Sequence, residues 1–167
     1  MRRIRPINAL VSLLMATILT TIIGPGSASA ASSPSSDINF TAPSKNIDCL
    51  LYTYENEVVA DCLVEQAAWK SKPPVPSDCD LDWVPTEVYL SSKQVGTKFV
   101  NTVGVGACRG DIGPLCVANG CTVLAYGKSV KRGRITCTSA TSGVTCFTTS
   151  GTRRGFTVNR AAYKFVS

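Results

Sequence analysis

Short runs in which apolar and polar residues alternate, separated by turn-forming residues, occupy most of the chain from residue 38 onward. Runs of this length and period are typical of β-strands that bury one face. So many short strands at close spacing indicate a sandwich or a barrel. We predict nine strands, over Ile38–Ala42, Asp48–Tyr54, Glu57–Cys62, Thr86–Ser91, Lys98–Val103, Thr122–Tyr126, Arg134–Thr138, Val144–Thr148 and Gly155–Val158.

Two segments have a pattern that favours short helical turns. One is Val64–Trp69, which the prolines after Lys72 would end, and the other is Ala161–Phe165, with Asn159 as a candidate N-cap. Between them, Ser71–Asp82 contains three prolines and is predicted to form an exposed, stiff loop. The fold class expected is therefore mainly β: a single disulfide-stapled sandwich or barrel-like domain with short helical turns.

The first 30 residues have the features of a signal peptide. Three arginines precede an apolar run of 15 residues, Ala9–Ile23, and the segment ends in Ala28-Ser29-Ala30, which fits cleavage after Ala30. A membrane-spanning helix needs roughly 20 apolar residues, so no span is expected after cleavage. We expect a secreted monomer, soluble or loosely associated with the cell wall, with a flexible leader over 31–37 and a disulfide-rich β domain over 38–167.

The eight cysteines all follow the predicted cleavage site, at Cys49, Cys62, Cys79, Cys108, Cys116, Cys121, Cys137 and Cys146. An even number of cysteines in an exported chain predicts disulfides. A zinc site is the alternative, but the chain has no histidine and no C-x-x-C spacing. Asp78, Asp80 and Asp82 alternate as in a calcium loop, yet Trp83 stands where that loop needs glycine. We therefore expect no metal and no cofactor.

Hairpin geometry favours two of the pairings. Cys49 and Cys62 are equidistant from residues 55–56, and Cys137 and Cys146 are equidistant from residues 141–142. In a hairpin with a two-residue turn, equidistant residues face each other, close enough for a disulfide at a non-hydrogen-bonded pair. We predict the bonds 49–62 and 137–146 on this ground.

The remaining four cysteines are less constrained. Cys116 and Cys121 can close a tight loop that contains Gly120, which would leave Cys79 and Cys108 to join the middle of the chain. Since turn position does not select these two pairings, their connectivity stays open.

Several motifs in order resemble a family of small secreted actinobacterial proteins that is known only as a domain of unknown function. Three departures stand out: Val84 replaces a usual glycine, Arg153-Arg154 replace a frequent Gly-His pair, and Cys116 and Cys121 look like an added pair. The resemblance implies an exported β domain and no established activity. The motifs are Phe40-x-x-Pro43-Ser44-x-Asn46-Ile47-x-Cys49, Trp69 followed by Pro73-Pro74, Cys79-x-x-x-Trp83, Leu124-x-Tyr126-Gly127, Gly143-Val144-Thr145-Cys146 and Gly155-Phe156-x-x-x-Arg160-x-x-Tyr163-x-x-Phe165.

Charge is distributed unevenly along the chain. Residues 31–111 contain 6 Lys and Arg against 11 Asp and Glu, whereas residues 112–167 contain 8 basic residues and no acidic one. One interpretation is a basic surface for an anionic envelope polymer or a secreted protein. The other is a solvated surface that faces the acidic half of the same domain. Few aromatic residues accompany the basic ones, so no specific nucleic-acid partner is expected. The candidate surface is Lys128, Lys131, Arg132, Arg134, Arg153 and Arg154.

Catalysis has little support in the sequence. Without histidine there is no Ser-His-Asp or Cys-His site, and paired cysteines supply no thiolate. No motif places two carboxylates together in a cleft, as glycoside hydrolysis requires. We therefore expect a non-catalytic extracellular or cell-envelope binding module. The alternative is a secreted protease inhibitor that presents either the Pro-rich loop Lys72–Ser77 or the loop between Cys116 and Cys121.

Overall fold

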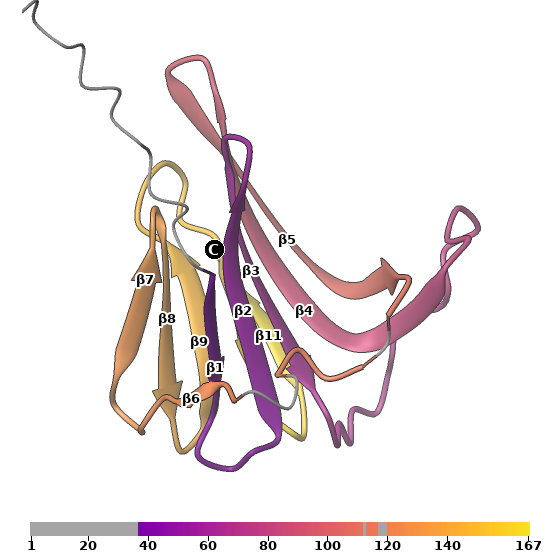
Figure 1. Ribbon diagram of the computed structural model, residues 1–167. Helices are drawn as coiled ribbons and strands as arrows, with labels where there is room; N and C mark the ends of the chain where they lie inside the picture. The colour runs from indigo at the N-terminus through magenta and orange to yellow at the C-terminus, as the bar shows by residue number, and fades with distance from the viewer. Residues whose placement is uncertain (1–36, 112, 117–119) are drawn as a thin grey trace, which may run out of the picture. The chain divides into compact units, whose positions relative to one another are not determined.

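The computed structural model describes residues 37–111, 113–116 and 120–167. Within these ranges the chain forms eleven β-strands in two sheets and contains no helix (Figure 1). The predicted signal peptide, residues 1–30, and leader residues 31–36 lie outside the described residues.

The six-stranded sheet has the order β5-β4-β3-β2-β1-β6. Its strands are β1 (Ile38–Thr41), β2 (Ile47–Tyr54), β3 (Glu57–Val64), β4 (Asp82–Val95), β5 (Lys98–Arg109) and β6 (Thr122–Val123). The five-stranded sheet has the order β11-β10-β9-β8-β7. Its strands are β7 (Ser129–Arg132), β8 (Ile135–Ala140), β9 (Gly143–Thr148), β10 (Gly155–Val158) and β11 (Tyr163–Val166).

Each sheet is built mainly from consecutive strands. Neighbouring strands are antiparallel except β1 and β6, which pair in parallel. Residues 38–109 supply five strands of the first sheet, and residues 129–166 supply the whole of the second. The uneven charge of the chain therefore becomes a difference between the two segments: acidic residues are in excess in the segment that builds the first sheet, and the segment that builds the second has no acidic residue.

The two sheets share one apolar core, which makes the domain sandwich-like. Every second residue of a strand points to the same face. Accordingly Cys49 and Leu51 of β2 are fully buried, as are Ile135 and Cys137 of β8. The largest fully buried side chains come from both sheets: Phe40, Leu51, Val88 and Leu90 from the first, and Ile135, Val144, Phe156 and Val158 from the second.

Two disulfides lie inside this core. Cys49 faces Cys62 across β2 and β3, and Cys137 faces Cys146 across β8 and β9, with Cα–Cα distances of 4.2 and 4.1 Å. All four residues are fully buried, so the pairs predicted from hairpin geometry are confirmed. The other four cysteines form the bonds Cys79–Cys108 and Cys116–Cys121.

The helical turn predicted over Val64–Trp69 is wrong. β3 continues through Val64, and the backbone N–H groups that follow bond to distant residues rather than to the preceding turn. Glu65 N–H donates to the carbonyl of Asn46 at 3.0 Å, and Ala68 N–H donates to the carbonyl of Arg160 at 2.7 Å. These tertiary hydrogen bonds replace the ones that a short, isolated helix would have to make by itself.

The helical turn predicted over Ala161–Phe165 is also wrong. Asn159 does cap this segment, since its Oδ1 accepts the N–H groups of Ala161 and Ala162 at 2.8 and 2.9 Å. However, Asn159 N–H donates to the carbonyl of Ala162 at 2.9 Å and closes a turn between strands. The residues that follow form β11, which pairs with β10 and so gains partners for its backbone hydrogen bonds. In this arrangement the centre of the Tyr163 ring lies 4.8 Å from that of the Trp69 ring.

Other strands differ from the prediction in length or existence. β4 and β5 are longer than expected, and their pairing shifts between Val84 and Val88. Pro85 lies in this bulge, because proline has no N–H to donate to a regular ladder. β7 falls where no strand was predicted, because its basic residues obscure the alternation of apolar and polar positions. β6 retains only Thr122–Val123 of the strand expected there.

Replacing Cys137 and Cys146 together by serine is expected to lower the free energy of unfolding by about 2–4 kcal/mol. The bond closes a hairpin, and both residues are fully buried, so the new hydroxyls would lack hydrogen-bond partners in the core. Replacing Cys116 and Cys121 should have a smaller effect, because their loop is shorter and both residues are partly exposed. Urea unfolding of the two double variants measures the difference, and the opposite order would contradict this account of the core.

Candidate functional site

The outer face of the six-stranded sheet carries an unusual group of polar and aromatic side chains. Asp61 of β3 pairs with Tyr89 of β4, and both point away from the core, opposite to their buried neighbours. Tyr52 on β2 and Glu87 on β4 lie diagonally beside Asp61 in the strand register. Diagonal neighbours on one sheet face are within reach of long side chains. Strand pairing therefore gathers these residues, which are far apart in the sequence.

These side chains line a cleft of about 540 Å³. This volume is in the usual range for small-molecule sites. Three tyrosines, three carboxyl residues and one arginine provide most of its chemical character. They are Tyr52, Tyr54, Tyr89, Glu57, Asp61, Glu87 and Arg109.

Two glycines of β5 leave room for aromatic rings of β4 beside the cleft. A side chain at Gly104 would overlap the ring of Tyr89, and one at Gly106 would overlap the ring of Trp83. The rings can therefore lie directly against the backbone of β5. Trp83 also donates from Nε1 to the carbonyl of Pro73 at 3.1 Å, which ties the Pro-rich loop to this edge of the sheet.

Two of the three carboxyl groups of the cleft, those of Asp61 and Glu87, are largely held out of water. Burial raises the pKa of Glu87 to about 7, with a further contribution from the negative charge of Asp61, while Arg109 acts in the opposite direction. Burial likewise raises the pKa of Asp61 to about 6, although a hydrogen bond from Tyr52 and the charge of Arg109 both lower it. The pKa of Tyr52 is raised by burial first and by Asp61 second. The cleft is therefore a place where negative charge is poorly compensated.

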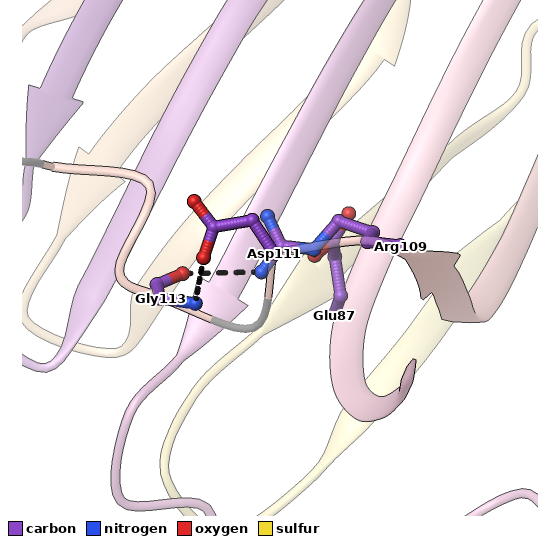
Figure 2. A network of polar contacts seen from close by, with 4 residues as sticks. All are labelled: Glu87, Arg109, Asp111 and Gly113. Carbon is purple, nitrogen blue, oxygen red and sulfur yellow. Dashed lines mark hydrogen bonds and ion pairs between the residues drawn. The ribbon is translucent and has the colours of Figure 1, made fainter. Parts of the chain in front are cut away.

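Arg109 connects the cleft to the segment that follows β5 (Figure 2). Its Nε lies 3.1 Å from Oε2 of Glu87, whose side chain is only 4% exposed. Its Nη2 donates to the carbonyl of Gly113 at 3.2 Å, and Gly113 N–H donates to Oδ1 of Asp111 at 2.7 Å. The Glu87–Arg109 contact is an ion pair without hydrogen-bond geometry, and neither of its two buried atoms has a hydrogen-bond partner among the described residues.

Two of the six basic residues predicted to form a surface point inward instead. Arg132 is only 8% exposed; its Nε donates to Oγ1 of Thr53 at 2.9 Å, and its Nη2 lies 3.5 Å from Oδ1 of Asp37. Arg134 is half-buried; it donates to Oγ and the backbone oxygen of Ser92 at 3.2 and 2.9 Å and lies 4.1 Å from the ring centre of Phe99. Both arginines therefore join the second sheet to the first, and the six residues do not share one exposed face.

The other four basic residues, Lys128, Lys131, Arg153 and Arg154, are exposed. Lys131 is opposite Thr136, which is opposite Phe147, and the guanidinium of Arg153 lies 4.7 Å from the ring centre of Phe147. Lys131 and Arg153 therefore lie on the outward face of the five-stranded sheet. The buried acid Glu87 pairs with Arg109 of its own sheet rather than with this basic group.

The residues of the cleft were not predicted from the sequence. The signal available was the carboxylate of Asp61 inside the apolar run Val58–Val64, and the hairpin of β2 and β3 could have placed it beside Tyr52. Glu87 could not be added in this way, because the 17 residues between β3 and β4 do not define their register.

Within the described ranges, no three His, Cys, Asp or Glu side chains are grouped so that they could hold a metal ion. Asp78, Asp80 and Asp82 are exposed. The part of the chain that the structure describes also contains no helix long and apolar enough to cross a membrane.

The stability of the domain should fall as the pH rises from about 5 to 7.5. Asp61 and Glu87 have raised pKa values, so the folded protein holds protons in this window that the unfolded chain releases. Their contribution is fully present below the unfolded pKa values and is lost as the pH passes about 6 to 7. We expect the free energy of unfolding to decrease by on the order of 2 kcal/mol across the window.

Urea unfolding at several pH values measures this slope. Asp61→Asn with Glu87→Gln should remove most of it, since neither amide titrates. Asp78→Asn, in the exposed loop, is the matched control. If the free energy of unfolding still decreased with pH in the double variant, other groups of the protein would be responsible for the decrease.

Substitutions of two adjacent residues in β7 compare how much an inward and an outward basic side chain contribute to stability. Arg132→Ala should lower the free energy of unfolding by about 1–3 kcal/mol, because it removes a buried cation from its oxygen partners. Lys131→Ala should change it by less than about 0.5 kcal/mol, because this side chain is exposed. Thermal and urea unfolding provide the comparison, and equal effects would show that Arg132 is not part of the sheet-to-sheet contact.

The family of the chain is established by comparison with known proteins. No curated protein and no solved structure gives a significant match. One family model matches residues 16–165, which is most of the chain and includes every strand residue except Val166, the last residue of β11. The chain therefore belongs to a family of unknown function (DUF6636).

Proposed function

We propose that the protein is a secreted, non-catalytic binding module that takes its ligand in the cleft on the outer face of the six-stranded sheet. The observation that carries this proposal is a cleft that combines a buried carboxyl group, Glu87, and a partly buried one, Asp61, with tyrosines on the face opposite to the core. Packing of the two sheets does not require them there, since the core lies on the other side.

The energetics of the cleft support a role in binding. Taking carboxylates out of water without full compensation destabilises the folded state. Alanine or serine on this solvent-facing side would avoid that cost. Strongly perturbed carboxyl groups in a cleft are more typical of functional sites than of ordinary sheet surfaces. The arrangement is what we expect where a ligand completes the charge balance.

Export is the second part of the proposal. Four disulfides in a small β domain are compatible with an extracellular location, where thiols are oxidised. The signal-peptide features of residues 1–30 support the same compartment. A binding module on or near the cell envelope fits both.

Glycoside hydrolysis would also use two carboxyl groups in a cleft, but the position of Glu87 favours binding instead. Its side chain is 4% exposed and is held against Arg109. A general acid must come within hydrogen-bond distance of the leaving oxygen of its substrate. Glu87 would have to leave Arg109 to do so.

Protease inhibition is a second candidate, because the Pro-rich loop is both exposed and tethered. Val75 in this loop is 60% exposed. Trp83 holds the carbonyl of Pro73, and the Cys79–Cys108 bond fixes the end of the loop to β5. For the alternative loop, residues 117–119 lie outside the described ranges. The candidate contacts for an anionic envelope polymer are the four exposed basic residues of the predicted surface, of which Lys131 and Arg153 lie on the outward face of the five-stranded sheet.

Retention of extracellular material by the immobilised protein tests the cleft. Tyr54→Ala with Asp61→Asn should abolish retention of components from cell-envelope extracts, whereas Lys131→Ala with Arg153→Ala should leave it unchanged. Retained material should elute uncleaved. The reverse pattern would move the site to the five-stranded sheet. Cleaved products would indicate an enzyme, and protease inhibition that Val75→Ala removes would indicate an inhibitor.

A further inference from the structure

We propose that the cleft recognises an organic cation, that is, a ligand that presents an ammonium group between the tyrosines and the carboxyl groups. This inference rests on the proposed binding function and names its ligand class.

The charges of the cleft are the first argument. Three acidic residues, Glu57, Asp61 and Glu87, line it, and Arg109 is the one basic residue among the described lining side chains. Arg109 is already engaged, since it contacts Glu87 and donates to the carbonyl of Gly113. The cleft therefore has an excess of negative charge that its own cation does not balance, and a ligand with positive charge is complementary to it.

The aromatic lining is the second argument. Tyr52, Tyr54 and Tyr89 come from two different strands and line the cleft together with the carboxyl residues. Tyrosine rings attract ammonium groups through their quadrupole, most strongly where water is excluded. Tyr89 is fixed against Gly104, which reduces the conformational freedom that binding would otherwise remove. The carboxylates would repel an anionic ligand.

The protonation of the cleft links binding to pH. The groups around Asp61 and Glu87 are Tyr52 of β2, Glu57 of β3, Tyr89 of β4 and Arg109 of β5. The one cation among them does not prevent the raised pKa values of both carboxyl groups. A bound ammonium would favour their ionised forms, so binding releases protons. Affinity for the cation should therefore increase as the pH rises from 5 to 7.5.

Two sources can supply the same chemistry: a quaternary head group or a lysine side chain. Choline and n-butylammonium represent them, and 3,3-dimethylbutan-1-ol and butan-1-ol are their neutral counterparts of similar shape. NMR titration of the purified protein gives the dissociation constants. We expect each cation that binds to do so at least about tenfold more tightly than its neutral counterpart. Tighter binding of choline indicates a quaternary ligand, and tighter binding of n-butylammonium indicates lysine.

Two variants locate the site without unfolding the protein. Asp61→Asn keeps the shape of the side chain and its contact with Tyr52 but removes the charge, and Tyr54→Ala alters a residue that is 67% exposed. Each should weaken cation binding about tenfold, whereas Asp78→Asn should not. The titration at pH 5 should also give weaker binding than at pH 7.5.

Equal affinity for cations and neutral counterparts would overturn the inference, as would a dissociation constant unchanged by Asp61→Asn. The retention experiment separates this failure from that of the proposed function. If the cations fail but retention of envelope material still depends on Tyr54 and Asp61, the cleft binds another class of ligand. If retention is also independent of these residues, the binding function of the cleft fails as well.

Discussion

The alternation of inward and outward side chains around one shared core is the constraint on which the rest of this structure depends. Cys49–Cys62 and Cys137–Cys146 each join directly opposite residues inside the core, so they hold the register of the two central hairpins. A slip of one residue reverses the face of every side chain in a strand. In β3 such a slip would turn Asp61 into the core and Cys62 out of it.

The same alternation divides the basic residues into two groups with different roles. Lys131 points outward, whereas Arg132, the next residue of β7, is buried against Thr53 and Asp37. Arg134 reaches Ser92 and Phe99 of the opposite sheet. Part of the charge in the second half of the chain is therefore structural, because Arg132 and Arg134 join the second sheet to the first. Lys128, Lys131, Arg153 and Arg154, by contrast, are exposed.

Unlike the core, the cleft lowers the stability of the fold. Buried carboxyl groups reduce stability, and Glu87 lacks a well-formed hydrogen bond at Oε2 despite its contact with Arg109. A domain of this size has a limited margin of stability, and the core disulfides enlarge it. Local arrangements that weaken a fold and are tolerated by the rest of it are typical of functional sites. This is the physical reason to look for a ligand on the outer face rather than in the core.

The sequence by itself determined what depends on residues close together in the chain. Turn position predicted both hairpin disulfides, and alternation predicted most strands, because a two-residue turn sets the register of the strands it joins. Local signals failed at Val64–Trp69 and Ala161–Phe165, where hydrogen bonds and strand pairing outweighed a helical pattern. Only the tertiary structure decided the cleft and the inward arginines. Asp61 and Glu87 meet through the pairing of β3 with β4, whose register is determined by the packing of the whole sheet and not by any turn between them.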